Sequence, residues 1–355
     1  MFSFDERILS DITSLRRGRA FENLYIYLTE LCNYKCKHCY LGKRLCQYNI
    51  MSLEDVYSNL EAWRMVGSTK VCFIGGEPTL YPFLSEAINK AWSLGYETII
   101  LGSNGSRSAL SVIKSLPLKH LTYIQISLDG ATSSTNDFIR QPGAFQETME
   151  TIHYLVSRRV DVRIIMTVNS FNISEMIPMI KLGDRAGVTL TKFHVMSEIG
   201  NAHESVLKPV HPNEWFLCCR EIKNYVSCHS LHTRVSFQPA YGDWKCKSDL
   251  MSYHGCVGKN LERISVFPNG DCYICSFLFD HDISYAHIKD GVITKRIPSE
   301  LECFYRTEAD CEKCQNKCGY DGCIAESLNN GQMSCFNLKL FPVCRLWKTE
   351  VNIHE

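Results

Sequence analysis

The sequence predicts an α/β fold: a partial, TIM-like (β/α)6 barrel followed by a cysteine-rich C-terminal domain. Two observations predict it. From residue 23, short apolar β-rich runs alternate with amphipathic helical periods, and after about residue 205 closely spaced cysteines replace this alternation. Near-continuous apolar strands separated by helices are typical of a parallel sheet with helices outside. Six units would leave the barrel open, since a closed one needs eight.

The expected elements follow one another regularly along the chain. Strands are expected at residues 24–30, 70–76, 98–105, 121–130, 161–170 and 189–196. Helices are expected at residues 52–67, 83–95, 107–117, 144–158, 174–186 and 211–228. We therefore divide the chain into an N-terminal segment (1–22), the barrel (23–205), a linking helical region (206–240) and the C-terminal domain (241–355).

Composition narrows the classes of function. The chain has 355 residues, 45% of them hydrophobic, which is enough for about two domains. Lys plus Arg and Asp plus Glu both number 38, so no broad basic surface for nucleic acid is expected. The chain has no apolar run of about 18 residues, so no membrane span is expected. Its charged N-terminus does not fit a signal peptide, and we expect a cytoplasmic location.

The cysteine content is unusual. The chain has 19 cysteines, an odd number that disfavours complete internal pairing. In the reducing cytosol disulfides are rare, and clustered cysteines usually hold metal. The cysteine clusters are therefore interpreted as metal sites first.

The first cluster directly follows the first expected strand. Cys32, Cys36 and Cys39 are separated by three and then two residues. A structural zinc site needs a fourth ligand, but the nearby His38 adjoins Cys39, and adjacent residues bind one ion awkwardly. Three thiolates on a short loop suit three irons of a [4Fe–4S] cube with one iron left open. The spacing alone leaves the cluster, zinc and a plain structural role open.

Polar residues end the next strands of the expected barrel. GGEP (75–78), SNG (103–105), SLDG (127–130) and TVN (167–169) each close a strand, and Arg140 follows the third of them. Taken singly, each is most simply a turn or a helix cap. In a barrel, the carboxyl ends of the strands meet at one mouth, beside the cysteine loop. Together these residues therefore predict one site.

On these motifs, residues 23–205 resemble the radical S-adenosylmethionine (SAM) enzymes. The resemblance implies that Cys32, Cys36 and Cys39 hold a [4Fe–4S] cluster whose open iron binds SAM. It implies reductive cleavage of SAM to a 5′-deoxyadenosyl radical, which takes hydrogen from substrate, with the electron supplied by a flavodoxin-type or ferredoxin-type donor. The residues that the resemblance assigns to the SAM pocket are His38, Gly75, Gly76, Glu77, Pro78, Asn104, Ser127, Asp129, Arg140 and Asn169.

Some of these residues have specific roles in the family. Glu77 would contact the SAM amino group, and Arg140 would pair with its carboxylate. Ser127 and Asp129 fall where the family contacts the ribose, and the backbone of His38 would lie near the adenine.

The C-terminal cysteines form a second block. The PNGD turn between two β runs predicts a hairpin near Cys275. Cys311, Cys314, Cys318 and Cys323 would also suit one four-thiolate zinc site. The block resembles the SPASM extension of radical SAM enzymes, although these four cysteines are spaced by two, three and four residues where the family has two, five and three.

The SPASM resemblance implies one or two auxiliary [4Fe–4S] clusters. The nearer cluster would take Cys256, Cys275 and Cys323, with Cys246 or Cys272 as a candidate fourth ligand. The farther cluster would take Cys311, Cys314, Cys318 and Cys344, with Cys335 as the alternative to Cys344. The differing spacing leaves this allocation open.

The resemblance also indicates a substrate class. SPASM enzymes mostly modify peptides, which implies oxidation or crosslinking of a peptide, with a separate peptide-carrier protein as one potential partner. The alternative is a dehydrogenase or epimerase of a sugar-type or aminocyclitol-type small molecule, and a non-enzymatic reading is a zinc-stabilised binding protein. The candidate substrate contacts on the first and sixth strands are Tyr25, Tyr27, Lys192, His194 and Glu198.

Overall fold

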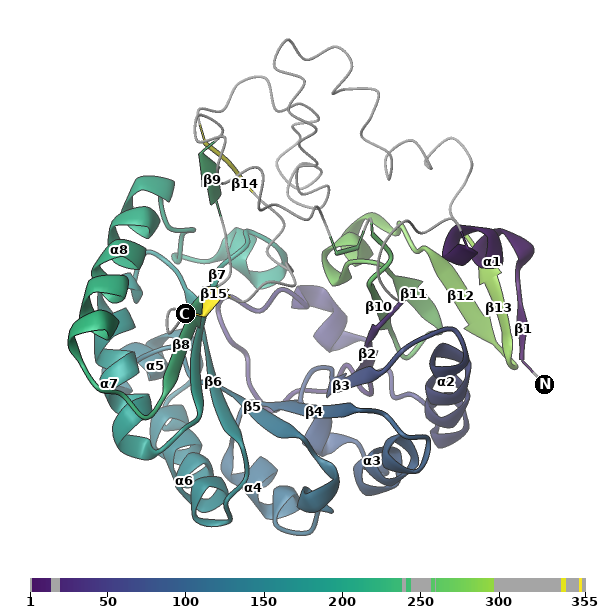
Figure 1. The fold of residues 1–355 in the computed structure, drawn as a ribbon, viewed down its shortest axis with the longest axis horizontal. Helices are drawn as coiled ribbons and strands as arrows, with labels where there is room; N and C mark the ends of the chain where they lie inside the picture. The colour runs from purple at the N-terminus through teal and green to yellow at the C-terminus, as the bar shows by residue number, and fades with distance from the viewer. Residues whose placement is uncertain are drawn as a thin grey trace.

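The computed structural model describes residues 2–13, 20–237, 257–258 and 260–296, together with the backbone of residues 241–243, 340–342 and 351–352. Its main sheet has 13 strands in the order β1-β13-β12-β11-β10-β2-β3-β4-β5-β6-β7-β8-β15. The sheet curls into an open barrel with helices on its outside (Figure 1). The predicted α/β class and the partial barrel are confirmed.

A run of parallel strands forms the barrel wall. In sheet order these are β10 (Arg263–Val266), β2 (Asn23–Tyr27), β3 (Lys70–Ile74), β4 (Thr98–Ser103), β5 (Tyr123–Ser127), β6 (Val162–Val168), β7 (Leu190–Val195) and β8 (Arg234–Phe237). The outer helices are α2 (Leu53–Met65), α3 (Leu84–Ser93), α4 (Arg107–Ile113), α5 (Ser133–Ile139), α6 (Ala144–Ser157), α7 (Met176–Ala186) and α8 (Pro212–Cys228). The six expected strands are present, and β8 and β10 extend the parallel run at its two ends.

Short elements complete the sheet beyond β10. They are β11 (Asp271–Tyr273), β12 (Ala286–Lys289), β13 (Val292–Lys295), β1 (Ser3–Phe4) and the helix α1 (Glu6–Thr13). At the other edge β15 (Val351–Asn352) pairs with β8, and β9 (Tyr241–Asp243) pairs separately with β14 (Leu340–Pro342). The hairpin predicted at PNGD is confirmed, because β10 and β11 pair antiparallel and Gly270 has a φ of +84°. The division of the chain at residue 241 stays a prediction, although β10 belongs to the same sheet as β2.

Single turns of 3-10 helix lie in the connections. They are η1 (Gly42–Cys46), η2 (Pro78–Leu80), η3 (Leu118–His120), η4 (Ile173–Glu175), η5 (Gly200–Glu204) and η6 (Ser276–His281). Four of them, η1, η2, η4 and η5, lie in loops that follow barrel strands at their carboxyl ends. That end carries the predicted site.

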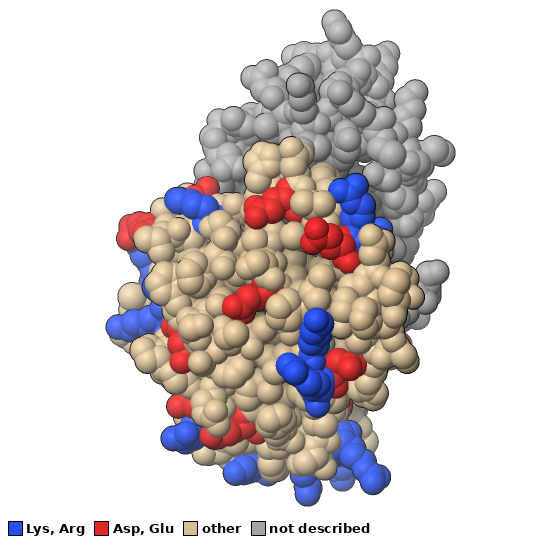
Figure 2. Space-filling view, turned by 90° about the vertical axis from the view of Figure 1, so that its left-hand side faces the viewer, with Lys and Arg blue, Asp and Glu red and all other residues tan. Residues whose placement is uncertain are grey.

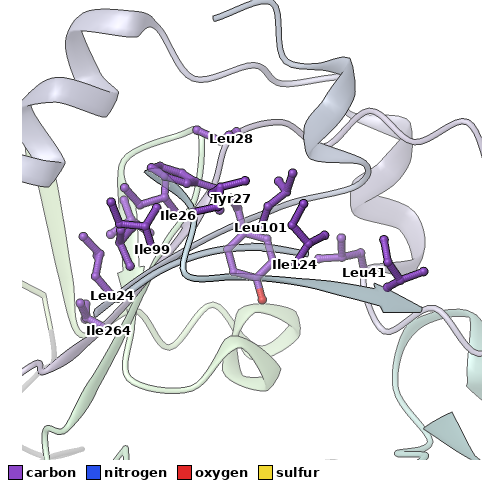
Figure 3. Close-up of a cluster of buried hydrophobic side chains, with 14 of the residues drawn as sticks. Leu24, Ile26, Tyr27, Leu28, Leu41, Ile99, Leu101, Ile124 and Ile264 are labelled. Atoms are coloured by element: carbon purple, nitrogen blue, oxygen red, sulfur yellow. The ribbon is translucent and has the colours of Figure 1, made fainter. Parts of the chain in front are cut away.

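The two faces of the barrel wall differ in burial. Leu24, Ile26, Leu101 and Ile124 point to the helices and belong to one buried apolar cluster (Figure 3). On β5, β6 and β7 the alternate residues are partly exposed on the inner face, and the register of β6 and β7 places them side by side: His194 is opposite Thr167, and Lys192 is opposite Ile165. This alternation follows from the two-residue period of a strand, so the inner face is available for a ligand.

The described surface carries charges of both signs. Figure 2 shows Lys and Arg side chains interspersed with Asp and Glu among uncharged residues on one face. Among the described residues, no helix has the length and apolar character needed to cross a membrane.

Candidate functional site at the barrel mouth

The loop that follows β2 carries Cys32, Cys36 and Cys39, all partly buried. Backbone groups of other loops hold it in place. Lys37 donates its N–H to the carbonyl of Ile139 at 2.9 Å. Asn201 donates its side-chain amide to the Cys36 carbonyl at 3.1 Å and its N–H to the Cys39 carbonyl at 2.9 Å. No pattern in the sequence pointed to Asn201, because its contact with the cysteine loop depends on the fold alone.

The thiols lie in an environment that disfavours free thiolates. Burial raises the pKa of Cys32 to about 11 and the pKa of Cys36 to about 12. Thiolates bind metal only after losing a proton, so a cationic centre must compensate for this cost. Within the described part of the chain, no three Cys, His, Asp or Glu side chains are placed to hold a single metal ion.

The first three residues of GGEP run beside the start of the cysteine loop. Gly76 donates its N–H to the Thr29 carbonyl, and Glu77 donates its N–H to the Leu31 carbonyl, both at 2.7 Å. A Cβ on Gly76 would lie 2.1 Å from the Leu31 oxygen, and Gly75 has a φ of +151°. Glycine is therefore required at both positions, one for space and one for its backbone conformation.

Glu77 is a buried carboxylate held by neutral donors. Its Oε1 accepts hydrogen bonds from the hydroxyls of Thr79 and Ser103, both at 2.8 Å. Its Oε2 accepts from the Asn104 N–H at 2.7 Å. Burial raises the pKa of Glu77, and these hydrogen bonds oppose the shift only in part. No Lys, Arg or His in the described part of the chain forms an ion pair with Glu77.

Asp129 joins two of the other predicted pocket residues. Its Oδ2 lies 2.7 Å from Nε of Arg140 and 3.2 Å from Nε2 of His38, and its Oδ1 accepts from the Thr167 N–H at 2.8 Å. Burial favours protonation of Asp129, but Arg140 and His38 outweigh it, and the net effect lowers the pKa. Asp129 is thus an anion that orients both side chains, a link that the sequence did not predict.

The remaining predicted pocket residues lie at the same mouth. Asn104 donates its side-chain amide to Asn33 at 2.8 Å, and Asn169 accepts from the Phe171 N–H at 2.9 Å. Ser127 is partly exposed at the end of β5. Pro78 begins the turn η2, for which the Glu77 side chain is the cap. Their contacts with SAM stay predictions.

An aromatic cluster connects the cysteine loop to the elements after β10. The Tyr27 ring stacks on Phe267 at 4.0 Å between ring centroids, and its hydroxyl lies 2.7 Å from that of Tyr40. Tyr40 follows Cys39 directly and contacts the ring of Phe277 at 5.5 Å. Tyr27 lies within the buried cluster of Figure 3. This packing favours a structural role for Tyr27 over the predicted substrate contact, because its burial leaves no face for a ligand.

A buried ion pair also lies between the cysteine loop and the elements after β10. Arg44 donates from Nη1 to Oε1 of Glu30 at 2.9 Å, and its guanidinium lies 4.7 Å from the Phe267 ring centre. Glu30 precedes Cys32 by two residues and is 1% exposed, so its charge depends on Arg44 and on the Asn49 amide at 2.7 Å.

Replacing Arg44 is expected to destabilise the protein, because it leaves the buried Glu30 carboxylate without its cation. Arg44→Gln should lower the free energy of unfolding by about 3–5 kcal/mol, whereas the double variant Arg44→Gln/Glu30→Gln should lose less. Anaerobic urea denaturation followed by circular dichroism measures both. A double variant less stable than Arg44→Gln would show that the pair does not act as described.

The other candidate substrate contacts differ in position. Three of them, Tyr25, Lys192 and His194, are partly exposed on the inner face. Their contact with substrate stays a prediction. Glu198 follows β7 and pairs with Nζ of Lys208 at 3.1 Å near the surface.

Two of the predicted auxiliary-cluster cysteines fall within the described residues. Cys272 on β11 and Cys275, two residues after the end of β11, are both buried in the main apolar cluster. The other predicted ligands, Cys246, Cys256, Cys311, Cys314, Cys318, Cys323, Cys335 and Cys344, lie outside the described residues. The allocation of auxiliary ligands therefore stays a prediction.

The residues at the mouth fit a SAM-bound iron–sulfur cluster. Three thiols lie on one loop, and the buried Glu77 offers a negative charge that an ammonium group would balance. His38 provides a further indication, since its Nδ1 is buried and has no hydrogen-bond partner among the described residues. A polar group of a ligand would satisfy that atom.

Comparisons with known proteins agree with this geometry. Residues 26–183 match the family model of the Radical SAM superfamily. A relative from Saccharolobus solfataricus, described as a probable GTP 3′,8-cyclase, is 28% identical over 81% of this chain and 92% of its own. A second relative, Fe-coproporphyrin III synthase from Methanosarcina barkeri, is 29% identical over 42% of this chain and 37% of its own.

Solved structures share the fold. SuiB from Streptococcus suis bound to S-adenosylmethionine superposes with a TM-score of 0.69 at 14% identity, covering 92% of this chain and 78% of that chain. Native anSMEcpe with bound AdoMet superposes with a TM-score of 0.58 at 18% identity, covering 83% and 88%. The likeness extends over most of the described barrel and shows the fold that the two proteins share with this chain.

Proposed function

Because residues 26–183 form a Radical SAM superfamily domain, which uses SAM and a [4Fe–4S] cluster, we propose that the chain is a radical SAM enzyme that oxidises or crosslinks a peptide. When bound, the cluster would supply the electron for reductive cleavage of SAM, and hence the radical chemistry for hydrogen-atom abstraction from substrate. The observation that carries the proposal is the buried, cation-free Glu77 carboxylate beside the three-cysteine loop.

Each residue of the mouth has a task in this proposal. Cys32, Cys36 and Cys39 hold the cluster through their thiolates, which leaves one iron for SAM. Glu77 binds the SAM ammonium group, for which its Oε2 retains acceptor capacity after the bond from Asn104. Ser127 binds the ribose. The loops over the strand ends exclude water from the reacting centre.

Arg140 and Asp129 act together in the pocket. Asp129 fixes the guanidinium through Nε, so the remaining nitrogens of Arg140 can meet the SAM carboxylate. The same carboxylate holds His38 beside the cluster loop, and we assign to Asp129 the orientation of both groups as well as a place near the ribose.

Two observations support a peptide substrate. The fold resembles SuiB bound to the precursor peptide SuiA, with a TM-score of 0.70 at 14% identity over 92% of this chain. The C-terminal cysteine pattern resembles that of SPASM enzymes, which mostly modify peptides. A flavodoxin-type or ferredoxin-type protein would supply the electron.

A second candidate substrate is a small anionic molecule with a sugar ring, such as GTP. The relatives described as probable GTP 3′,8-cyclases favour it, as does Arg263 on the inner side of β10. The guanidinium of Arg263 is buried, lies 3.9 Å over the Tyr25 ring and donates to the Ser265 and Ser276 hydroxyls. No carboxylate among the described residues pairs with Arg263, so an anionic ligand group would complement it.

One experiment separates these functions. Anaerobically purified protein is analysed for iron, sulfide and zinc. It is then reduced and incubated with SAM alone, with GTP, or with synthetic peptides encoded by short reading frames near its gene, and 5′-deoxyadenosine is followed by mass spectrometry. Stimulation by a peptide supports the proposal, and stimulation by GTP alone would support the second candidate. Zinc without iron would contradict radical chemistry altogether.

A further inference from the structure

The guanidinium of Arg140 bridges a carboxylate and a cysteine of the cluster loop. Its Nε lies 2.7 Å from Asp129, and its Nη1 donates to Sγ of Cys36 at 4.0 Å. The Arg140 side chain is 6% exposed and that of Asp129 is 0% exposed, so solvent does not screen this arrangement. Cys36 is therefore the thiol that faces a fixed positive charge.

The fold fixes the position of the Arg140 guanidinium relative to the cysteine loop. Arg140 follows the last residue of α5, and the carbonyl of that residue, Ile139, accepts the N–H of Lys37, which follows Cys36. Asp129 is held from the other side, because its N–H donates to Asn136 of α5 at 2.9 Å and its Oδ1 accepts from Thr167. Hydrogen bonds of the backbone N–H groups of Lys37, Asp129 and Thr167 therefore hold both Cys36 and Arg140 in place.

A positive charge at this position would affect how readily a cluster on this loop accepts an electron. Adding an electron to a thiolate-bound iron–sulfur cluster increases its negative charge, and hydrogen bonds to sulfur and nearby positive charge favour the reduced form. Cys32 and Cys39 accept hydrogen bonds from neutral backbone N–H groups, such as that of Tyr34 to Sγ of Cys32 at 3.5 Å, whereas among the described side chains only Arg140 donates a hydrogen bond to a cysteine of this loop.

We propose that Arg140 sets the reduction potential of the cluster held by Cys32, Cys36 and Cys39, by donating a charge-assisted hydrogen bond to the Cys36 sulfur while Asp129 keeps the guanidinium oriented. This proposal rests on the proposed function, because it requires the cluster on these three cysteines. It assigns Arg140 a positioning role that is separate from any contact with SAM.

The test is a redox titration of the anaerobic holoenzyme, monitored by electron paramagnetic resonance and run without SAM. Omitting SAM ensures that a role of Arg140 in binding the SAM carboxylate cannot cause the shift. Signals of auxiliary clusters are identified in the Cys32→Ala/Cys36→Ala/Cys39→Ala variant and subtracted. Arg140→Gln should lower the ratio of reduced to oxidised cluster at a fixed potential by about tenfold, a shift of about 59 mV for one electron.

Two further variants complete the test. Arg140→Lys keeps the charge but loses the fixed fork, so it should shift the potential in the same direction by a smaller amount. Arg163→Gln is the matched control, because Arg163 lies at the start of β6 and pairs at 3.0 Å with Asp161, just before that strand. This substitution should leave the potential unchanged. An unchanged potential in Arg140→Lys and Arg140→Gln would overturn the proposal, as would an equal shift in Arg163→Gln.

The outcome also separates this proposal from the proposed function. A wild-type protein without an iron–sulfur cluster would remove both. A wild-type protein that cleaves SAM, with a potential that does not depend on Arg140, would remove only this one. If Arg140→Gln binds no cluster, Arg140→Lys alone decides, since a wild-type potential in that variant contradicts the proposal.

Discussion

Glu77→Gln is expected to weaken SAM binding about tenfold to a hundredfold, because a hydrogen bond to a charged group is worth about 1.5–3 kcal/mol. The carboxylate is buried, and its partners are hydroxyls and backbone N–H groups, so among the described residues no cation balances its charge. The amide of glutamine carries no charge, and its NH2 group would face a donor if it took the place of Oε2. SAM cleavage should fall with the binding.

Equilibrium dialysis of radiolabelled SAM against the anaerobic holoenzyme measures this effect, with iron content determined in the same samples. Glu22→Gln is the control, because Glu22 precedes β2 and pairs at 3.3 Å with Lys70, the first residue of β3, at the opposite end of the barrel. The control should bind SAM like the wild type. Unchanged SAM affinity in Glu77→Gln, with intact iron, would show that Glu77 does not meet the ammonium group.

Gly76→Ala is expected to remove most of the cluster and with it SAM cleavage. The added methyl group would lie 2.1 Å from the oxygen and 2.5 Å from the carbonyl carbon of Leu31, and both atoms are backbone. The residue after Leu31 is Cys32, so the displacement needed to relieve the clash moves a cluster ligand directly. A flexible side chain could move aside, but the backbone of residues 29–31 is held in place by the hydrogen bonds from Gly76 and Glu77.

Iron and sulfide content per chain, together with 5′-deoxyadenosine formation, measures the loss. Gly95→Ala is the matched control: Gly95 has a φ of +72°, yet nothing lies within 4 Å of its Cβ position. That variant should lose about 1–2 kcal/mol of stability from its backbone conformation and keep its iron. Full iron content in Gly76→Ala would contradict the description of this contact.

The sequence predicted the barrel well because its strands are apolar runs separated by amphipathic helices, a local pattern. The boundaries of β3, β6 and β7 lie within two residues of the expected ranges. β8 was missed, since a strand of four residues carries little periodicity, and so was the parallel pairing of β10 with β2, which is a tertiary event. No local pattern reports which strand will lie beside another.

The candidate site shows the same division. The positions of Cys32, Glu77 and Asp129 after three strands correctly predicted that they lie at one mouth, because strand ends meet there in any barrel of this kind. The partner of each group was not predictable: the Asp129 link between His38 and Arg140 joins residues from three loops. Tyr27 was expected to share the accessible face of Tyr25, but its contacts with Phe267 and Tyr40 bury it.

The central claim is that the three-cysteine loop holds a cluster that cleaves SAM. The most direct measurement incubates dithionite-reduced protein with SAM and follows 5′-deoxyadenosine, comparing the wild type with the Cys32→Ala/Cys36→Ala/Cys39→Ala variant. The wild type should form 5′-deoxyadenosine, and the variant, with the rest of the fold intact by circular dichroism, should form none. Equal 5′-deoxyadenosine formation by the two proteins would contradict the assignment of this loop.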